Sequence, residues 1–143
     1  MLHEFIATGF FVGRLAYAPG TLGTLLGVPL VYLVSFNSWT VITTVVALFV
    51  VGLVSSNEVI KLTGDQDPEE VVIDEIVGYI ACFTFVEPTL KTYILAFILF
   101  RLLDIFKPFP INLFEKLHGA YGVMMDDLVA GIITSIILFL LLK

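Results

Sequence analysis

Five carboxylates lie inside or beside the most apolar stretches of the chain. They are Asp74 and Glu75 in VVIDEIVGYI, Asp104 in FILFRLLDIFKPFP, and Asp126 and Asp127 in YGVMMDDLVAG. A carboxylate among aliphatic and aromatic side chains costs several kcal/mol unless a cation or a proton compensates its charge. Oxygen ligands without a Cys or His cluster favour a hard ion, Mg²⁺ above Mn²⁺ or Ca²⁺, and argue against zinc. The acids therefore predict a Mg²⁺ site.

Not every acid fits metal binding equally well. Asp126, just before LVAG, suits a helix N-cap or first turn as well as it suits a metal ligand. Asp74 follows three β-branched residues, and there ligation is favoured. The acids of the polar segment, Asp65, Glu69 and Glu70, are expected to form a solvated face.

Basic residues accompany the third acid. Arg101, Asp104 and Lys107 are spaced three residues apart, which places them on one face of a helix. An internal ion pair between Arg101 and Asp104 explains this spacing without any ligand. A guanidinium beside a divalent-cation site also binds the non-bridging oxygens of a phosphate, and the spacing supports both interpretations equally.

The stretch AYAPGTLGTLLG offers a third candidate feature. Gly20, Thr21 and Thr24 and their backbone N–H groups precede or open an apolar helix, where unpaired N–H groups and the helix dipole favour an anion. The stretch lacks the GK[ST] ending of a Walker A motif. A Pro-Gly turn leading into a Thr-capped helix explains it equally well.

The composition places the chain in the membrane class. Its 143 residues suffice for one domain, residues 1–143. They are 59% hydrophobic and 14% charged, against about a quarter charged in soluble domains, and the mean hydropathy is +1.05. The net charge of −6 argues against nucleic acid as a partner.

The apolar segments predict an all-α fold, a compact membrane-embedded bundle of about five apolar helices with amphipathic interfacial helices. Each apolar segment is somewhat shorter than the roughly 20 residues that cross a bilayer comfortably. The interfacial helices are expected at Leu2–Phe11 and within INLFEKLHGAY, where Ile111, Phe114 and Leu117 have helical spacing. The apolar helices are expected at Thr21–Phe36, Trp39–Val54, Val71–Val86, Leu90–Phe106 and Leu128–Leu142.

If successive apolar helices alternate in direction, the candidate site residues come together. The first, third and fifth apolar helices would begin, and the fourth would end, at the same end of the bundle. The acids, the bases and the PGTLGT stretch would then meet there. The basic residues on that side make it cytoplasmic by the positive-inside rule. They are Arg14, Lys61, Lys107 and Lys116.

Four stretches of the chain together resemble the phosphatidylglycerophosphatase A family of bacterial membrane lipid phosphatases. They are APGTLGTL from Ala18, VIDEIVGY from Val72, FRLLDIFKPFPI from Phe100 and GVMMDDLVAGI from Gly122. The resemblance implies Mg²⁺-dependent hydrolysis of the terminal phosphomonoester of phosphatidylglycerophosphate, which yields phosphatidylglycerol and phosphate. It also implies the bacterial cytoplasmic membrane, crossed several times, with the active site facing the cytoplasm and the bilayer as partner. A homo-oligomer is compatible with the sequence.

The family's chemistry assigns roles to the clustered residues. One or two Mg²⁺ ions would neutralise the phosphate and activate a water molecule, while basic groups would stabilise the transition state. The predicted metal ligands are Asp74, Glu75, Asp104, Asp126 and Asp127. The predicted phosphate-binding residues are Arg101, Lys107, Thr21, Thr24 and Gly20, and the predicted catalytic residues are Asp74, Asp104, Asp127 and Arg101.

Two other functions compete with the phosphatase. An ion or proton transporter would place its carboxylates near the bilayer midplane. A membrane scaffold would only pair acids with bases, but here the acids outnumber the nearby bases. The segment GDQDPEEVV contains more acids than the resemblance to the family leads us to expect. The role of Asp67 in it is therefore open between a metal ligand and a loop residue.

Overall fold

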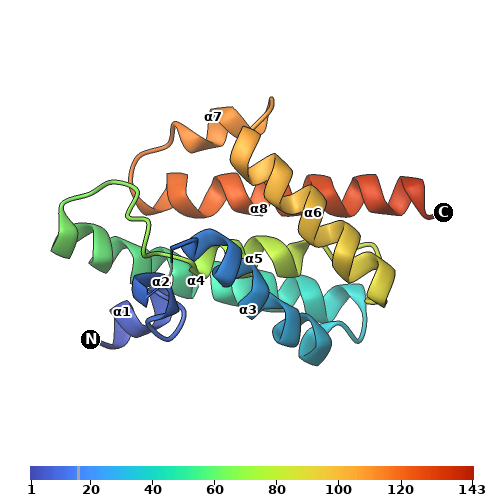
Figure 1. Cartoon of the computed structure of the whole chain (residues 1–143), viewed down its shortest axis with the longest axis horizontal. Helices are drawn as coiled ribbons and strands as arrows, with labels where there is room; N and C mark the ends of the chain where they lie inside the picture. Colours follow the sequence, from blue (N-terminus) through green and yellow to red (C-terminus); the bar gives the residue numbers. More distant parts are fainter. Residues whose placement is uncertain (16) are drawn as a thin grey trace.

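The structure, a computed structural model, describes residues 1–15 and 17–143, and within them it contains eight helices and no strand. The all-α prediction is confirmed. Figure 1 shows the central α5 between α8 on one side and α3 and α4 on the other. The helices are α1 (Leu2–Ala7), α2 (Val12–Leu15), α3 (Pro19–Val34), α4 (Ser38–Thr63), α5 (Ile73–Ala81), α6 (Leu90–Phe106), α7 (Ile111–Glu115) and α8 (Ala120–Leu141).

Helices α3 and α6 have nearly the predicted bounds. Pro19 occupies the first turn of α3, where its fixed φ and missing N–H cost nothing. Helix α6 begins with a capping box, in which Thr89 accepts a bond from the backbone N–H of Thr92 and the side chain of Thr92 binds the backbone of Thr89. It ends at Lys107, which has a left-handed φ of 45°.

Helix α4 is longer than predicted. Asn37 and Thr40 form a capping box at its start, and the helix ends 26 residues later before Gly64, which has a φ of 73°. The chain after Val54, where the predicted helix ended, is therefore helical as far as Thr63. Ser55 and Ser56 are buried, as are Val59 and Ile60, so the added part of the helix buries both polar and apolar side chains.

Helix α5 is shorter than predicted and contains nine residues. The expected helix to Val86 stops at Ala81, because Thr84 donates its hydroxyl proton to the Ala81 carbonyl and competes with the helical bond. The backbone N–H of Phe85 then donates to Ser135 Oγ of α8, at 3.0 Å. The chain leaves the helix because these side chains satisfy its backbone.

Helix α8 begins eight residues before the predicted Leu128. Gly119 precedes it with a φ of 65° and a ψ of −142°, a conformation that glycine adopts without steric cost. Asp126 and Asp127 therefore lie inside the helix. The prediction that these two acids open the helix is wrong, and of the two interpretations of Asp126 the N-cap or first-turn one is excluded.

The short helices differ from the predicted interfacial helices. The N-terminal segment forms α1 and α2, separated by Gly9, Phe10 and Phe11, which all have positive φ. Helix α7 ends at Glu115 and therefore excludes Leu117, while Ile111 is fully buried against the core. Part of each expected apolar face thus packs inside the protein.

Two helices, α4 and α8, are long and apolar enough to cross a membrane, by length and composition alone. Helix α3 is apolar but has 16 residues, and α5 is far too short. A bundle of five apolar spanning helices is therefore not confirmed. Large apolar side chains are nevertheless well exposed on several helices, among them Leu33, Trp39, Val50, Leu90 and Ile94.

Glycines allow α5 and α8 to approach each other closely. A Cβ atom on Gly131 would lie 2.1 Å from the Gly78 carbonyl oxygen, and one on Gly78 would lie 2.6 Å from the Asp127 carbonyl oxygen. Side chains at either position would separate the helices. Positions 74 and 78 of α5 face 127 and 131 of α8, so the two helices run parallel.

The contact predicts a clear effect of Gly131→Ala. The added methyl group meets backbone, which cannot rotate away, so the variant should lose about 1–3 kcal/mol of unfolding free energy despite its better helix propensity. Thermal unfolding in detergent measures the loss. Ile132→Ala, at a partly exposed position of the same helix, is the control. A Gly131→Ala protein as stable as the parent would contradict the proposed contact.

Candidate active site

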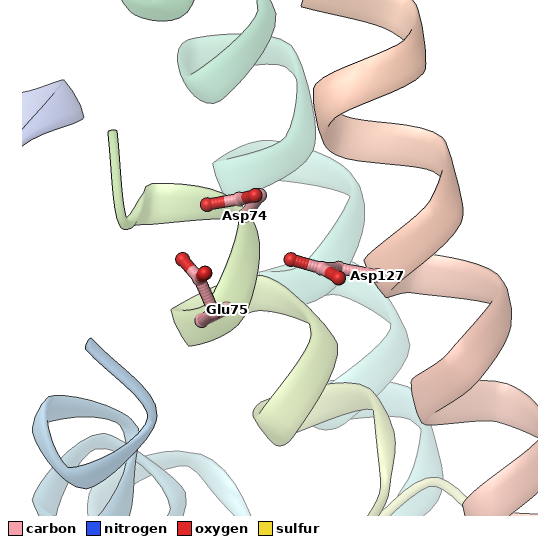
Figure 2. Close-up of side chains that lie close together, drawn as sticks. All are labelled: Asp74, Glu75 and Asp127. Atoms are coloured by element: carbon pink, nitrogen blue, oxygen red, sulfur yellow. The ribbon is translucent and has the colours of Figure 1, made fainter. Parts of the chain in front are cut away.

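Three of the five acids converge at the start of α5. Asp74 and Glu75 come from its first turn and Asp127 from α8, and one carboxylate oxygen of each lies within 4.8 Å of the others. Figure 2 shows the three carboxylates gathered around the first turn of α5, with Asp127 reaching towards it from α8. Asp74 is 7% exposed and Asp127 is 2% exposed. The arrangement is a compact group of oxygen ligands.

Each of these acids has a buried oxygen without a hydrogen-bond partner. The atoms are Asp74 Oδ1, Glu75 Oε2 and Asp127 Oδ2. A buried polar atom normally finds a partner, and a charged one costs more than a neutral one when it does not. Unpartnered oxygens on all three grouped acids are the strongest sign of a ligand in the described part of the chain.

The position of the acids on α5 perturbs their protonation. Burial raises the pKa of Asp74, and it raises the pKa of Glu75 well above the usual range, with a further increase from the neighbouring Asp74 charge. The N-terminal end of the helix dipole favours negative charge there but cannot offset three adjacent carboxylates. The group therefore needs a proton or a cation at neutral pH.

A second cluster at the end of α6 carries the positive charge. Arg101 donates to Asp104 through its guanidinium group. Lys107 Nζ lies 2.7 Å from Asp126 Oδ2 and 3.4 Å from Asp104 Oδ1. Asp126 Oδ1 accepts the backbone N–H of Asp127 at 2.8 Å. The ion-pair interpretation of Arg101 and Asp104 is thus confirmed, and Lys107 joins α6 to α8.

The acidic neighbours determine the charge of Lys107. Burial lowers the pKa of this amine, but the bond to Asp126 and the charges of the nearby aspartates outweigh that effect and raise it above its ordinary value. Lys107 therefore stays protonated at neutral pH. Its side chain is 23% exposed, so the ammonium group lies at the border of the site.

Gly20 joins the two clusters to the start of α3. A Cβ atom at Gly20 would lie 3.0 Å from Arg101 Nη1 and 3.0 Å from Glu75 Oε1. The PGTLGT stretch, the bases and the acids therefore meet at one end of the fold, as the alternating arrangement predicted. Any larger residue at position 20 would fill the space between the guanidinium and the carboxylate.

The two threonines of this stretch differ in position. Thr24 is fully buried and donates its hydroxyl proton to the Gly20 carbonyl at 2.8 Å, within its own helix. Thr21 lies in the first turn of α3 and is partly exposed. Ala18, the N-cap, supplies no side-chain bond to that turn. Of the two predicted phosphate contacts, Thr21 has the more accessible position.

The chain matches the sequence model of the phosphatidylglycerophosphatase A family over residues 5–142. It belongs to this family. It is 35% identical over 137 residues to phosphatidylglycerophosphatase A of Escherichia coli, covering 94% of this chain and 80% of that protein. It is 36% identical over 140 residues to phosphatidylglycerophosphatase A of Haemophilus influenzae, covering 94% and 85%.

A third relative carries a different name. A Bacteroides thetaiotaomicron protein, provisionally named a phosphatidylinositol-3-phosphatase, is 37% identical over 142 residues, covering 93% of this chain and 89% of that protein. No solved structure matches the chain. Membership of the phosphatidylglycerophosphatase A family makes the chain a phosphoric monoester hydrolase, and the predicted family and enzyme class are confirmed.

In the structure, the five predicted metal ligands fall into two sets that differ in their partners. Asp74, Glu75 and Asp127 form the group with unpaired oxygens, while Asp104 and Asp126 bind Arg101 and Lys107. Metal binding by the second pair stays a prediction. The sequence contains no local signal for this division, because Lys107 and Asp126 are 19 residues apart.

The polar segment before α5 differs in part from the predicted solvated face. Asp65 and Glu69 are exposed, but Glu70 Oε2 accepts from Arg14 Nε at 2.5 Å. Arg14 also donates to Glu4, which joins α1 and α2 to this segment. Asp67 is exposed and lines a cavity of about 210 Å³ that also reaches Asp126. It lies outside the three-acid group.

Lys107→Met should destabilise the protein. Asp126 would lose its cationic partner while staying largely buried, and Asp104 would keep only Arg101, a loss of about 1–3 kcal/mol. Denaturant or thermal unfolding in detergent measures it. Lys91→Met removes the same charge from an exposed position at the other end of α6 and should change little. Equal effects of the two substitutions would show that the contacts of Lys107 contribute nothing.

Proposed function

We propose that this chain is a Mg²⁺-dependent lipid phosphatase that hydrolyses the terminal phosphomonoester of phosphatidylglycerophosphate to phosphatidylglycerol and phosphate. One observation carries the proposal: three buried carboxylates with unpaired oxygens lie beside an arginine and a lysine at one end of the fold. Two relatives that cover most of the chain are named phosphatidylglycerophosphatase A.

The three-acid group fits a hard divalent cation. Its ligand atoms are all carboxylate oxygens, which Mg²⁺ prefers, and they are close enough to share one ion. Asp74, Glu75 and Asp127 would hold the ion, with water and substrate oxygens completing its coordination. A bound Mg²⁺ would supply positive charge against the phosphate and lower the pKa of a water molecule.

The basic residues are suited to bind the phosphate. Arg101 presents its guanidinium next to Gly20 and Glu75, so a phosphate placed there can accept two parallel bonds from it. Lys107 adds a second positive charge at the border of the site. Asp104 and Asp126 orient these two groups, and the first turn of α3, with Thr21, adds N–H and hydroxyl donors.

The nucleophile in this proposal is water. A phosphoenzyme would require one aspartate of the cluster set apart from the cation group, and the five clustered acids are each committed either to that group or to a base. A carboxylate of the site would take a proton from the attacking water, whose oxygen bonds to phosphorus as the bond to the ester oxygen breaks. The same carboxylate would return that proton to the leaving alcohol oxygen. Recovery of a ³²P-labelled protein adduct would exclude this route.

A lipid environment suits the outer surface of the protein. Helices α4 and α8 satisfy the length and composition expected of spanning helices, and many large apolar side chains are exposed. The proposed location is the bacterial cytoplasmic membrane. Arg14, Lys61, Lys107 and Lys116 would lie on the cytoplasmic side with the active site.

Phosphatidylinositol 3-phosphate is a second candidate substrate, because the Bacteroides relative is provisionally named for that activity. It shares a lipid phosphomonoester with phosphatidylglycerophosphate, so the same charged residues would serve. The transporter interpretation is not favoured, since Asp74 and Glu75 lie in the first turn of α5, Asp104 lies in the last turn of α6, and Asp127 lies in the third turn of α8 rather than at its middle. A direct comparison of the two lipids at equal surface concentration decides between the substrates.

The decisive test measures phosphate release by purified protein in detergent micelles. Release from phosphatidylglycerophosphate should require Mg²⁺, stop in EDTA, and fall at least a hundredfold in Asp127→Asn, which removes charge but keeps shape. Mg²⁺ should also raise the thermal midpoint of the parent protein, by the equivalent of about 2.7 kcal/mol at a hundred times its Kd, and not that of the variant.

Asp65→Asn is the matched control, because Asp65 lies in the exposed segment outside the three-acid group. It should retain both phosphate release and the Mg²⁺-dependent shift. Normal phosphate release by Asp127→Asn would remove this residue from the site. Undiminished release in EDTA would refute the requirement for a divalent ion.

A further inference from the structure

An apolar groove runs along the outside of the protein between α3 and α6. Its volume is about 240 Å³, and it is lined by Leu25 and Val28 of α3, by Ile94, Phe97 and Ile98 of α6, and by Tyr79 of α5 at its base. Leu25, Ile94 and Ile98 are each about half exposed, at 47%, 52% and 50%. The groove is therefore an accessible apolar surface.

The walls of the groove lead to the candidate active site. Thr21, Leu25 and Val28 stand at i, i+4 and i+7, on one face of α3. Ile94, Ile98 and Arg101 have the same spacing on α6. At about 1.5 Å per residue, each wall extends about 10 Å away from its polar residue.

The base of the groove repeats this pattern. Glu75 and Tyr79 stand at i and i+4 on α5. Tyr79 is fully buried, and its hydroxyl donates to the Tyr93 carbonyl at 2.9 Å, so its ring is held in place. On all three helices, a residue of the polar site is followed along the same face by an apolar residue of the groove.

We propose that this groove binds one acyl chain of the phospholipid whose phosphate occupies the active site; the inference rests on the proposed function. A phospholipid carries its apolar chains on the same molecule as its phosphate, and the groove begins about one helical turn from Arg101 and Thr21. Its volume lies below the roughly 300–1,000 Å³ of pockets that enclose drug-sized ligands, so it accommodates part of one chain and not both.

The groove also explains how the lipid would reach the site. The half-exposed side chains of Leu25, Ile94 and Ile98 leave the groove open to the outside along its length. A lipid can therefore enter sideways from the surrounding apolar phase while its phosphate moves towards Arg101. Burial of each methylene group favours the bound chain and so favours lipids over free phosphomonoesters.

The test compares two substrates, dioleoyl phosphatidylglycerophosphate and its deacylated head group, under Mg²⁺. Ile98→Trp and Leu25→Trp fill the groove from opposite walls. Each should lower the ratio of kcat/KM for the lipid to that for the head group about tenfold, the equivalent of about two buried methylenes. Val50→Trp, on the exposed face of α4, adds the same bulk outside the groove and should leave the ratio unchanged.

Each alternative outcome is informative. An unchanged ratio in both groove variants overturns the inference and leaves the proposed phosphatase function intact. An equal fall in Val50→Trp would also overturn it, because general contact with detergent or lipid would then explain the effect. If the parent protein releases phosphate from neither substrate, the proposed function fails together with the inference.

Discussion

The close contact between α5 and α8 is the constraint on which the site depends. Gly78 and Gly131 let the two backbones approach to a distance that no side chain would permit. Because the helices run parallel, this contact also determines their register and sets Asp74 opposite Asp127. The apolar residues around them, among which Val77 and Ala130 are fully buried, hold the carboxylates together against their mutual repulsion.

The distribution of charge explains why simple pairing does not describe the site. Arg101 and Lys107 are the two bases in it, and both are already engaged by Asp104 and Asp126. Among the described residues, the three-acid group therefore has no basic partner of its own. A phosphate could approach these acids only where a cation or protons compensate their charge, and the proposed Mg²⁺ would do so. The geometry thus favours a ternary arrangement of acids, cation and phosphate over a scaffold in which acids and bases only neutralise each other.

Features encoded by local patterns could be predicted from the sequence, and features that depend on tertiary contacts could not. The capping residue Thr89 marks the start of α6, and alternation of the apolar segments brings the charged clusters to one end. The path of the chain after α5 depends on Ser135, which binds the backbone of Phe85 from fifty residues further along the chain. The role of Glu70 depends on Arg14 at a distance of 56 residues. The start of α8 depends on the backbone conformation of Gly119. The predicted start follows Asp126 and Asp127, because two adjacent acids are typical of a helix start, and the prediction therefore misses Gly119.

The placement of charge at helix ends has a functional consequence. A transporter must make its binding site accessible in turn from both sides of a membrane, which favours acids near the middle of a spanning helix. Here Asp74 and Glu75 lie in the first turn of α5, and Arg101 lies near the end of α6. In the proposed membrane location, these turns would stand at the level where lipid head groups meet water, so the charged atoms could act on a phosphate without drawing it into hydrocarbon. Chemistry at an interface, with the apolar part of the substrate left beside the helices, is the function that this placement supports.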